Sequence, residues 1–206
     1  MGAMKMIQAV ASRPRGRPRE FDEARVLSRA IALFSASGYS ATGISDLQQA
    51  TGLTAGSLYK AYLDKEGIFA KALERYIARR EAEVSVMIKG AENARASITA
   101  LLGLYARLSQ GKEGKLGCLL VAGIAELPQF SRVGDALRGQ LAQRRDLLAR
   151  LVAQGQDDGS ITTASDPATV ADVLLALLQG MRVLGKASAF SDDADAFVAL
   201  ALKVLE

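Results

Sequence analysis

Residues 44–65 read ISDLQQATGLTAGSLYKAYLDK and contain two short helical patterns on either side of a glycine. In the first pattern, Ile44, Leu47 and Ala50 recur every three residues, so they lie along one face of a helix. Gly52 follows, and a glycine at this point can adopt the left-handed conformation that ends a helix. The stretch therefore predicts a first helix that stops at a tight turn.

The second pattern begins directly after that turn. Thr54 is a favourable N-cap, because its hydroxyl can accept a hydrogen bond from the next turn, and the helix that it caps is predicted from Ala55 to about Tyr62. In a helix-turn-helix, the start of this second helix approaches base edges in the major groove of DNA. Two short helices joined at glycine also occur in proteins that never touch DNA, so the motif alone leaves both interpretations open.

The flanking sequence continues the helical pattern in both directions. Residues Phe21 to Ser37 carry an apolar helical stripe with Asp22 as the N-cap, and Gly38 ends it. Residues Asp64 to Glu66 open a further helix whose apolar positions continue to Ile77. A three-helix unit is thus followed directly by a connecting helix.

These residues, taken together, resemble the tetracycline-repressor-like (TetR) family of transcriptional regulators. The similarity covers Gly16 to about Leu73 and rests on the run AIALFSASGYSATGISDL, the turn ATGLT, the string GSLYKAYLDKEGIF and their order. The resemblance implies an all-α fold of about nine helices. It also implies a basic N-terminal arm at 1–19, a helix-turn-helix DNA-binding domain at 20–65, and a larger ligand-binding and dimerisation domain at 66–206.

The resemblance also assigns DNA contacts residue by residue. Tyr59 and Lys65 would touch phosphates, and Tyr39, Thr42 and Thr54 would help to position the DNA backbone. The positions that usually meet bases or adjacent phosphates are held in this chain by Ala55, Gly56, Ser57 and Lys60.

Two glycines depart from the family pattern. Gly43 stands where a serine or threonine commonly caps the first short helix, which would remove one phosphate contact. Gly67 lies inside the first turn of the connecting helix and is expected to loosen the joint between the domains.

Positive charge is concentrated in the first part of the chain. Residues 1–80 contain 13 Lys and Arg against 7 Asp and Glu, whereas residues 81–206 contain 13 against 15. A basic region supplies sequence-independent affinity for phosphates, which weakens with salt. Much of the excess lies in the segment SRPRGRPRE, whose prolines and glycine oppose a regular helix. Arg15 and Arg17 could enter a narrow minor groove, as an AT-hook does, or could belong to a basic tail that contacts only the DNA phosphates.

The second half of the chain is also predicted to be helical. The expected helices are Ala91 to Leu108, Leu116 to Leu127, Arg132 to Gln154, Asp166 to Lys186 and about Asp192 to Leu205, with a loop at Gly111 to Gly117. The pair Arg132 to Gln154 and Asp166 to Lys186 is richer in apolar residues than a small core needs. We expect this pair to form a four-helix bundle across the two-fold axis of a homodimer, as the resemblance also implies; ordinary core packing is the alternative.

An unknown small-molecule effector is expected in the larger domain, in a mostly apolar pocket with a few polar groups. The candidate lining residues are Met87, Leu101, Tyr105, Cys118, Leu119, Phe130, Met181 and Leu184, and core packing is the ordinary alternative for each. Cys118 lies at a predicted helix start near Lys115, where a redox-sensing thiol can arise, although a buried cysteine is more often inert.

Composition argues against an enzyme. The chain has no histidine, so the commonest general base and metal ligand is missing, and neither a cofactor nor a metal site is expected. The single cysteine cannot form an internal disulfide, and no secretory signal precedes the basic arm. No apolar run reaches the ~20 residues that span a bilayer. We therefore expect a cytoplasmic protein that does not enter a membrane.

These observations lead to one functional expectation and one alternative. We expect a dimeric, ligand-responsive repressor that binds a palindromic operator in double-stranded DNA. The alternative is a helical adaptor or a non-specific DNA-binding protein without small-molecule induction.

Overall fold

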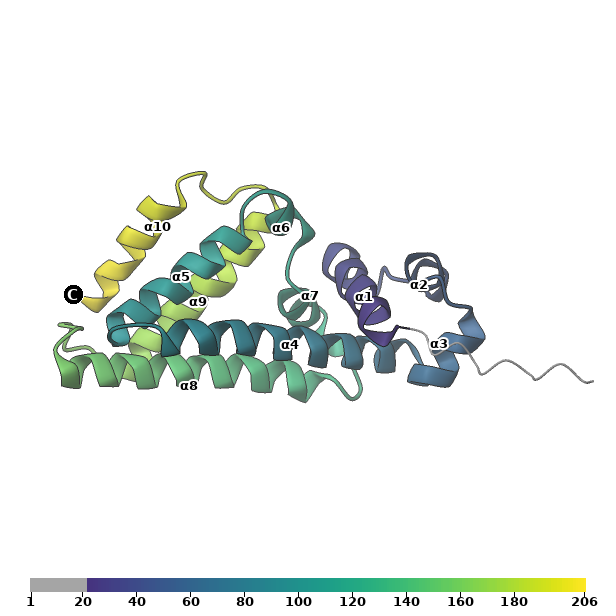
Figure 1. The fold of residues 1–206 in the computed structure, drawn as a ribbon, viewed down its shortest axis with the longest axis horizontal. Helices are drawn as coiled ribbons and strands as arrows, with labels where there is room; N and C mark the ends of the chain where they lie inside the picture. The colour runs from purple at the N-terminus through teal and green to yellow at the C-terminus, as the bar shows by residue number, and fades with distance from the viewer. Residues whose placement is uncertain (1–21) are drawn as a thin grey trace, which may run out of the picture.

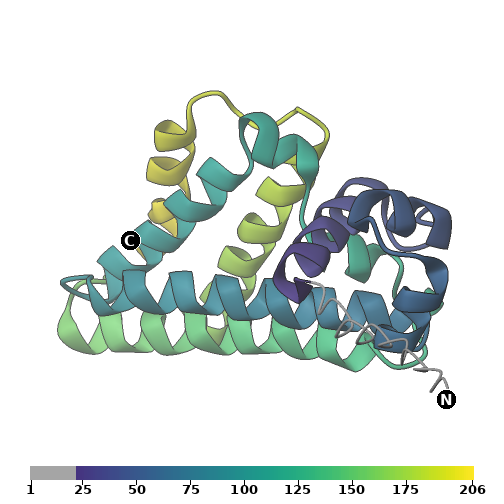
Figure 2. The ribbon, with the colours of Figure 1, turned by 45° about the vertical axis from the view of Figure 1, so that its right-hand side comes forward.

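The computed structural model describes residues 22–206, and this part of the chain folds into helices without a strand (Figure 1). The all-α fold predicted from the sequence is confirmed. The elements in chain order are α1 (Glu23–Ser37), α2 (Ile44–Thr51), α3 (Ala55–Tyr62), α4 (Lys65–Lys89), α5 (Ala94–Leu108), α6 (Gly111–Leu116), α7 (Leu119–Ala125), the 3-10 helix η1 (Leu127–Gln129), α8 (Gly134–Asp158), α9 (Pro167–Lys186), α10 (Ala194–Ala201) and the 3-10 helix η2 (Leu202–Leu205). The long helices α4 and α8 run along the molecule, and α1 to α3 lie at one end (Figures 1 and 2).

The helix-turn-helix forms where its local signals predict. The Asp22 carboxylate accepts a hydrogen bond from the N–H of Arg25 at 3.2 Å and caps α1. Gly52 ends α2 in the left-handed conformation, with φ at 76°. Thr54 caps α3, because its hydroxyl accepts a hydrogen bond from the N–H of Ser57 at 3.2 Å. Both capping bonds join residues three apart, so neither needs a distant partner.

The two glycines that depart from the family pattern are explained by their neighbours. The N–H of Gly43 donates to the Asp46 carboxylate at 2.8 Å, so an acidic side chain caps the start of α2. A Cβ at Gly67 would lie 1.9 Å from the carbonyl oxygen of Tyr62. The expectation that Gly67 loosens the joint is therefore wrong, because its missing side chain lets α4 approach the end of α3 closely.

The link between α3 and α4 contains a strained residue. Leu63 has φ at 73° and ψ at −55°, and the N–H of Asp64 donates to the carbonyl oxygen of Tyr62 at 2.9 Å. This is a γ-turn of the rare type that is unfavourable for a residue with a side chain. The Leu63 side chain is 72% exposed, so packing does little to offset the strain.

The connector, residues 109–133, differs from its prediction. The predicted loop at Gly111 to Gly117 contains helix α6, and the described residues hold ten α-helices, close to the predicted number of about nine. The single helix predicted from Leu116 to Leu127 is divided into α7 and η1.

Helix α6 packs closely against α9. A Cβ at Gly114 would lie 2.3 Å from the carbonyl oxygen of Ser109 and 3.3 Å from that of Gly185 on α9. Gly117 then takes a φ of 88°, which ends α6 and turns the chain into α7. Because Gly185 lies 71 residues after Gly114 in the chain, the contribution of α9 is not visible in the local sequence pattern.

The last helices agree with their predictions except at their ends. Helix α8 begins and ends slightly later than the predicted Arg132 to Gln154, and Gly159 stops it with φ at 76°. The Asp166 carboxylate accepts a hydrogen bond from the N–H of Thr169 at 2.9 Å and caps α9, as predicted. The final predicted helix is shorter, because the chain tightens into η2 after α10.

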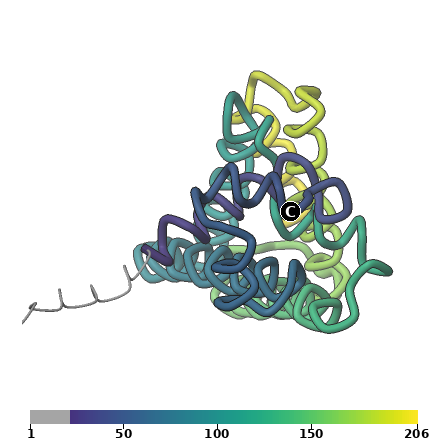
Figure 3. The backbone as a smooth tube through the Cα atoms, turned by 90° about the vertical axis from the view of Figure 1, so that its right-hand side faces the viewer, coloured from purple at the N-terminus to yellow at the C-terminus, as the bar shows by residue number. Residues whose placement is uncertain are grey.

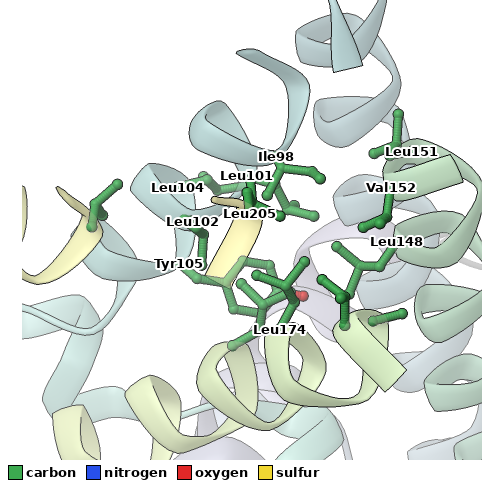
Figure 4. Packing of buried hydrophobic residues seen from close by; sticks show 14 of the residues in the cluster. Ile98, Leu101, Leu102, Leu104, Tyr105, Leu148, Leu151, Val152, Leu174 and Leu205 are labelled. Atoms are coloured by element: carbon green, nitrogen blue, oxygen red, sulfur yellow. The ribbon is translucent and has the colours of Figure 1, made fainter. Parts of the chain in front are cut away.

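Two clusters of buried apolar side chains hold the helices together. In the first, Ile98 of α5, Leu148 of α8 and Leu174 of α9 meet with residues of α10 and η2 (Figure 4). The second joins α1, α2 and α3 to the first half of α4, to α7 and to the start of α8. Figure 3 shows the end of the molecule where α1, α2 and α3 lie. The helix-turn-helix therefore shares an apolar core with the connector.

Helix α9 is long and largely apolar. It is the one described helix that could cross a membrane by length and composition, with a mean hydropathy of 1.4 in its most apolar window. Within the protein it packs extensively against α8 and also against α5 and α6. Only 39% of that window is buried, so packing within the chain accounts for part of the apolar surface of the helix and leaves the rest exposed.

Candidate nucleic-acid interface

The outer face of α3 is open to solvent. Tyr59 is 47% exposed, Gly56 and Lys60 are also exposed, and Ala55 and Ser57 are half-buried. A Cβ at Gly56 would meet no atom within 4 Å, so nothing crowds the start of the helix. This face therefore presents small side chains, one phenol and one ammonium group.

Lys65 lies against the turn that precedes α2. Its ammonium donates to the carbonyl oxygens of Tyr39 at 3.0 Å and Thr42 at 3.1 Å, and lies 4.3 Å from the centre of the Tyr39 ring. Thr42 is buried, and its hydroxyl donates to the carbonyl oxygen of Gly38 at 2.6 Å. These three predicted DNA contacts thus fix the shape of the turn, and their contact with DNA stays a prediction.

The remaining predicted DNA contacts lie at the start of α3 and in the arm. Thr54 is exposed, and its hydroxyl lies 3.0 Å from that of Ser57. Arg15 and Arg17 lie outside the described residues, so a role for them in the minor groove stays a prediction.

A carboxylate of the connector holds the turn before α2. Glu126 accepts hydrogen bonds from the N–H groups of Tyr39 at 2.8 Å and Ser40 at 2.9 Å. Burial raises the pKa of Glu126, but the bonds from Ser40 and Tyr39 outweigh it and hold the pKa below its ordinary value. A Cβ at Gly38 would lie 2.5 Å from the carboxylate, so this approach requires a glycine.

A second carboxylate joins the start of α4 to the start of α8. Glu66 is 8% exposed and accepts bonds from the hydroxyl of Ser131 at 2.7 Å and from the N–H groups of Arg132 at 2.6 Å and Val133 at 3.1 Å. Burial raises the pKa of Glu66, yet these bonds together lower it below its ordinary value. The guanidinium of Arg132 also pairs with Asp64 at 2.7 Å.

A lysine of α9 completes the attachment. Lys186 donates to the carbonyl oxygens of Ser35 at 2.6 Å and Ala36 at 2.9 Å, at the end of α1. We refer to the contacts of Glu126, Glu66 and Lys186 as the anchoring contacts. They connect the end of α1, the turn before α2 and the start of α4 to residues that are 65 to 151 positions away in the sequence.

The predicted ligand residues do not gather in one place. Tyr105 and Cys118 line a cavity of about 20 Å³. The other six are dispersed. Leu101 and Met181 are buried in the first apolar cluster, with Met87 at its edge, and Leu119 is buried in the second. Phe130 packs on Tyr39 and Phe69, and Leu184 is 43% exposed. The sequence pattern identified these residues as apolar, but it did not show which of them line the same cavity.

The polar residues of that cavity were missed. They include Arg80, Arg144 and Arg182, which are all buried, together with Tyr76 and Gln140. The sequence of α8 does indicate buried polar groups, because Gln140 and Arg144 occupy inward positions between the apolar residues 137 and 148. Charged residues are seldom fully buried, so sequence reasoning assigns them to the surface by default.

Two family models match this chain. Residues 26–72 match the model described as bacterial regulatory proteins, tetR family, and residues 94–200 match the tetracyclin repressor-like C-terminal domain. The HTH-type transcriptional repressor ComR of Escherichia coli is 32% identical over 180 residues, which cover 85% of this chain and 84% of ComR. The uncharacterized HTH-type transcriptional regulator YezE of Bacillus subtilis is 25% identical over 93% of this chain and 100% of its own length.

A solved structure shows the same architecture. A cysteine-substituted form of the TetR family transcriptional regulator CifR, complexed with 26 bp double-strand operator DNA, has a TM-score of 0.83 and 29% identity. The alignment covers 93% of this chain and 100% of the CifR chain. Together with the helix-turn-helix geometry, these matches show that the chain belongs to the TetR family of bacterial transcriptional regulators.

Proposed function

We propose that this regulator is a repressor that binds a palindromic operator as a homodimer, and that a small-molecule effector in the larger domain releases it. The observation that supports DNA binding is the solvent-exposed outer face of α3, whose inner face is packed in the apolar core. Tyr59 and Lys60 are exposed there, whereas Leu58 and Tyr62 on the opposite face are buried. The operator-bound CifR structure and the repressor ComR support the same conclusion.

The anchoring contacts support a regulatory role for the larger domain. They join the turn at Tyr39, the end of α1 and the start of α4 to the connector, α8 and α9. A change in the larger domain would therefore reach α3 through hydrogen bonds and a shared core. An effector can shift this arrangement only by its difference in affinity for the two states.

Helix α9 supplies the face proposed for dimerisation. Val173, Leu177, Gly180 and Leu184 recur along one stripe of the helix, and Val173 and Leu184 are more than 40% exposed. Exposed apolar stripes of this kind mark protein interfaces. With the neighbouring α8, two copies would form the predicted four-helix bundle, which would place two α3 helices in successive major grooves.

The proposal assigns binding rather than catalysis to this protein and places it in the cytoplasm with the DNA. The family of transcriptional regulators supports both assignments. The absence of histidine from the sequence is in keeping with a binding role.

Selection of binding sites from random duplexes with the full chain tests DNA recognition. We expect a palindromic site to be enriched and Lys60→Gln to weaken binding to it about tenfold or less, with a salt slope smaller by about one. Lys112→Gln, which removes an exposed positive charge from α6, is the matched control and should leave binding unchanged. Equal affinity for the selected and random duplexes would show that the protein is not a specific regulator.

Sedimentation velocity tests the dimer. The double variant Val173→Glu/Leu184→Glu should sediment as a monomer at micromolar concentration, because two carboxylates would be buried in an apolar interface. Leu200→Glu alters a leucine of α10 that is 72% exposed and should leave the dimer intact. Dimers in both variants would place the interface elsewhere.

A further inference from the structure

Three arginines meet at the small cavity between the two apolar clusters. Arg80 of α4, Arg144 of α8 and Arg182 of α9 all line it, and each is at most 9% exposed. Buried guanidinium groups are costly unless they are paired. The partners of these arginines therefore show how much of the positive charge is balanced.

The balance is incomplete at Arg182. Arg80 pairs with Glu83 at 2.6 Å, and Arg144 lies 3.3 Å from Glu81. Arg182 donates through Nη2 to the carbonyl oxygen of Gly117 at 2.6 Å, and among residues 22–206 its Nη1 has no hydrogen-bond partner although it is buried. A neutral carbonyl does not balance the charge of this guanidinium.

The tyrosines at the cavity do not supply the missing negative charge. Burial raises the pKa of Tyr105, so its phenol stays neutral at physiological pH. Burial, followed by the proximity of Cys118, also raises the pKa of Tyr76. The cavity thus presents hydrogen-bond donors and an excess of positive charge.

A wider groove lies on the side of Cys118 and Arg182 that reaches the end of α1. It has a volume of about 430 Å³ and shares Cys118 and Arg182 with the cavity. Its walls include the apolar residues Val121, Ala122, Ala125, Val183 and Ala187, and it also reaches Gly38, Glu126 and Lys186. Two of the anchoring residues therefore line the groove directly.

We propose that this chain binds a small organic carboxylate, with its head at Arg182 in the cavity and its apolar tail in the groove beside Glu126 and Lys186. The cavity, of about 20 Å³, has room for little more than one water molecule, so one carboxylate oxygen could enter it while the rest of the ligand lies in the groove. A guanidinium fork matches a carboxylate in two parallel hydrogen bonds. The apolar walls favour a carboxylate with a hydrocarbon tail over a fully hydrated inorganic anion.

The position of the site gives the effector a route to α1. The bound head would compete with the carbonyl oxygen of Gly117 for Arg182. Gly117 packs closely on the end of α1, because a Cβ there would lie 2.9 Å from the carbonyl oxygen of Ser35, which Lys186 also binds. A carboxylate head that draws Arg182 away from Gly117, together with a hydrocarbon tail beside Lys186, would loosen the contacts of Gly117 and Lys186 with the end of α1. Operator binding would then weaken.

Calorimetry with hexanoate, hexanamide and inorganic phosphate tests the binding site on the full chain without DNA. All titrations are made at one ionic strength set with sodium chloride. We expect hexanoate to bind and the neutral amide of the same shape, as well as phosphate, to bind at least about tenfold more weakly. Equal binding of hexanoate and hexanamide, or binding of phosphate alone, would overturn the proposal.

Two variants separate the head site from the tail site. Arg182→Gln should weaken hexanoate binding about tenfold or more, whereas Arg182→Lys keeps the charge and should retain part of the affinity. Ala122→Leu leaves the arginines in place but fills the groove, and it should also weaken hexanoate binding. Lys112→Gln is the charge control and should bind hexanoate normally. Unchanged affinity in both Arg182→Gln and Ala122→Leu would show that the ligand binds elsewhere.

The expected effect of the carboxylate on DNA binding rests on the proposed function. A failure of the anion site can be distinguished from a failure of the repressor function. Hexanoate should lower the affinity of the wild type for the selected duplex and should have little effect on Arg182→Gln. If the protein prefers the selected duplex but does not bind hexanoate, the anion site is wrong and the repressor remains. If it binds hexanoate but prefers no duplex, the proposed function fails while the anion site stands.

Discussion

The helix-turn-helix and the connector are both short helical segments, yet they are held in different ways. Caps in the helix-turn-helix join residues three apart, as between Ser57 and Thr54. In the connector, Glu126 reaches back 87 residues to Tyr39, and the carbonyl oxygen of Gly117 is held by Arg182, 65 residues further on. The first segment was predicted nearly to the residue, whereas the second was predicted with its loop and helix misplaced.

The difference is one of interaction range. Caps and left-handed glycines act on the nearest turn, so a sequence pattern contains all the information that is needed. The connector instead packs on α1, α4 and α9, and three of its glycines, Gly114, Gly117 and Gly123, lie at close approaches to other segments. Four substitutions test this contrast, from the largest expected effect to the smallest.

The largest effect is expected where the connector crosses α9. A Cβ at Gly185 would lie 2.4 Å from the carbonyl oxygen of Ser109, so Gly185→Ala must push α9 away from this residue, which follows the end of α5. We expect a loss of about 3 kcal/mol in the free energy of unfolding, measured by urea denaturation. Gly139→Ala on α8 is the control, because a Cβ there meets nothing within 4 Å, and it should be neutral or slightly stabilising. Equal stabilities of the two variants would contradict the close crossing.

The next effect concerns the anchoring carboxylate Glu66. Glu66→Gln keeps the shape of the side chain but weakens three hydrogen bonds to residues 131–133. We expect a loss of about 2 kcal/mol at pH 7 in the free energy of unfolding.

This loss should depend on pH in a defined direction. The pKa of Glu66 is lower in the folded protein than its ordinary value of 4.5, so folding favours the charged form. The added stability is complete above pH 4.5 and is lost as the pH falls through the folded-state pKa. Urea titrations from pH 7 downwards should therefore show the wild type and Glu66→Gln converging in acid. A constant difference over that range would contradict the assignment.

A smaller effect is expected from the local cap of α3. Thr54→Ala removes the hydroxyl that accepts the N–H of Ser57 and should cost about 1 kcal/mol. Thr54→Ser retains the hydroxyl and should remain close to the wild type in urea denaturation. Because the cap is local, hydrogen exchange should accelerate in α3 while the connector keeps its protection. Faster exchange throughout the connector would show that the two segments are not independent.

The smallest effect is expected at the strained turn after α3. Leu63→Gly relieves a positive φ but increases the entropy of the unfolded chain, so we expect a net gain of about 0.5 kcal/mol. Leu63→Ala removes the exposed side chain and keeps the strain, so it should be neutral or slightly destabilising. Thermal unfolding of the two variants compares them directly, and a lower midpoint for glycine than for alanine would argue against strain.

The two candidate sites differ in the same way as the two segments. The exposed positions of α3 follow from helical spacing, so Gly56, Tyr59 and Lys60 could be placed on its outer face from the sequence. The internal role of Lys65 could not, because its two carbonyl partners lie in a turn more than twenty residues earlier. For the cavity, the sequence suggested Tyr105 and Cys118 but gave no reason to bury Arg182 beside them.

By itself, the sequence determined most of the helices, the helix-turn-helix and the family of this protein. These depend on apolar spacing, caps and a compact motif, all of which act within about one helical turn. The tertiary structure alone decided that α6 is a helix, that Gly67 permits a close joint, and that three arginines surround one cavity. The physical reason is that each depends on atoms from distant segments, whose approach determines which polar groups are buried and which glycines have no room for a side chain.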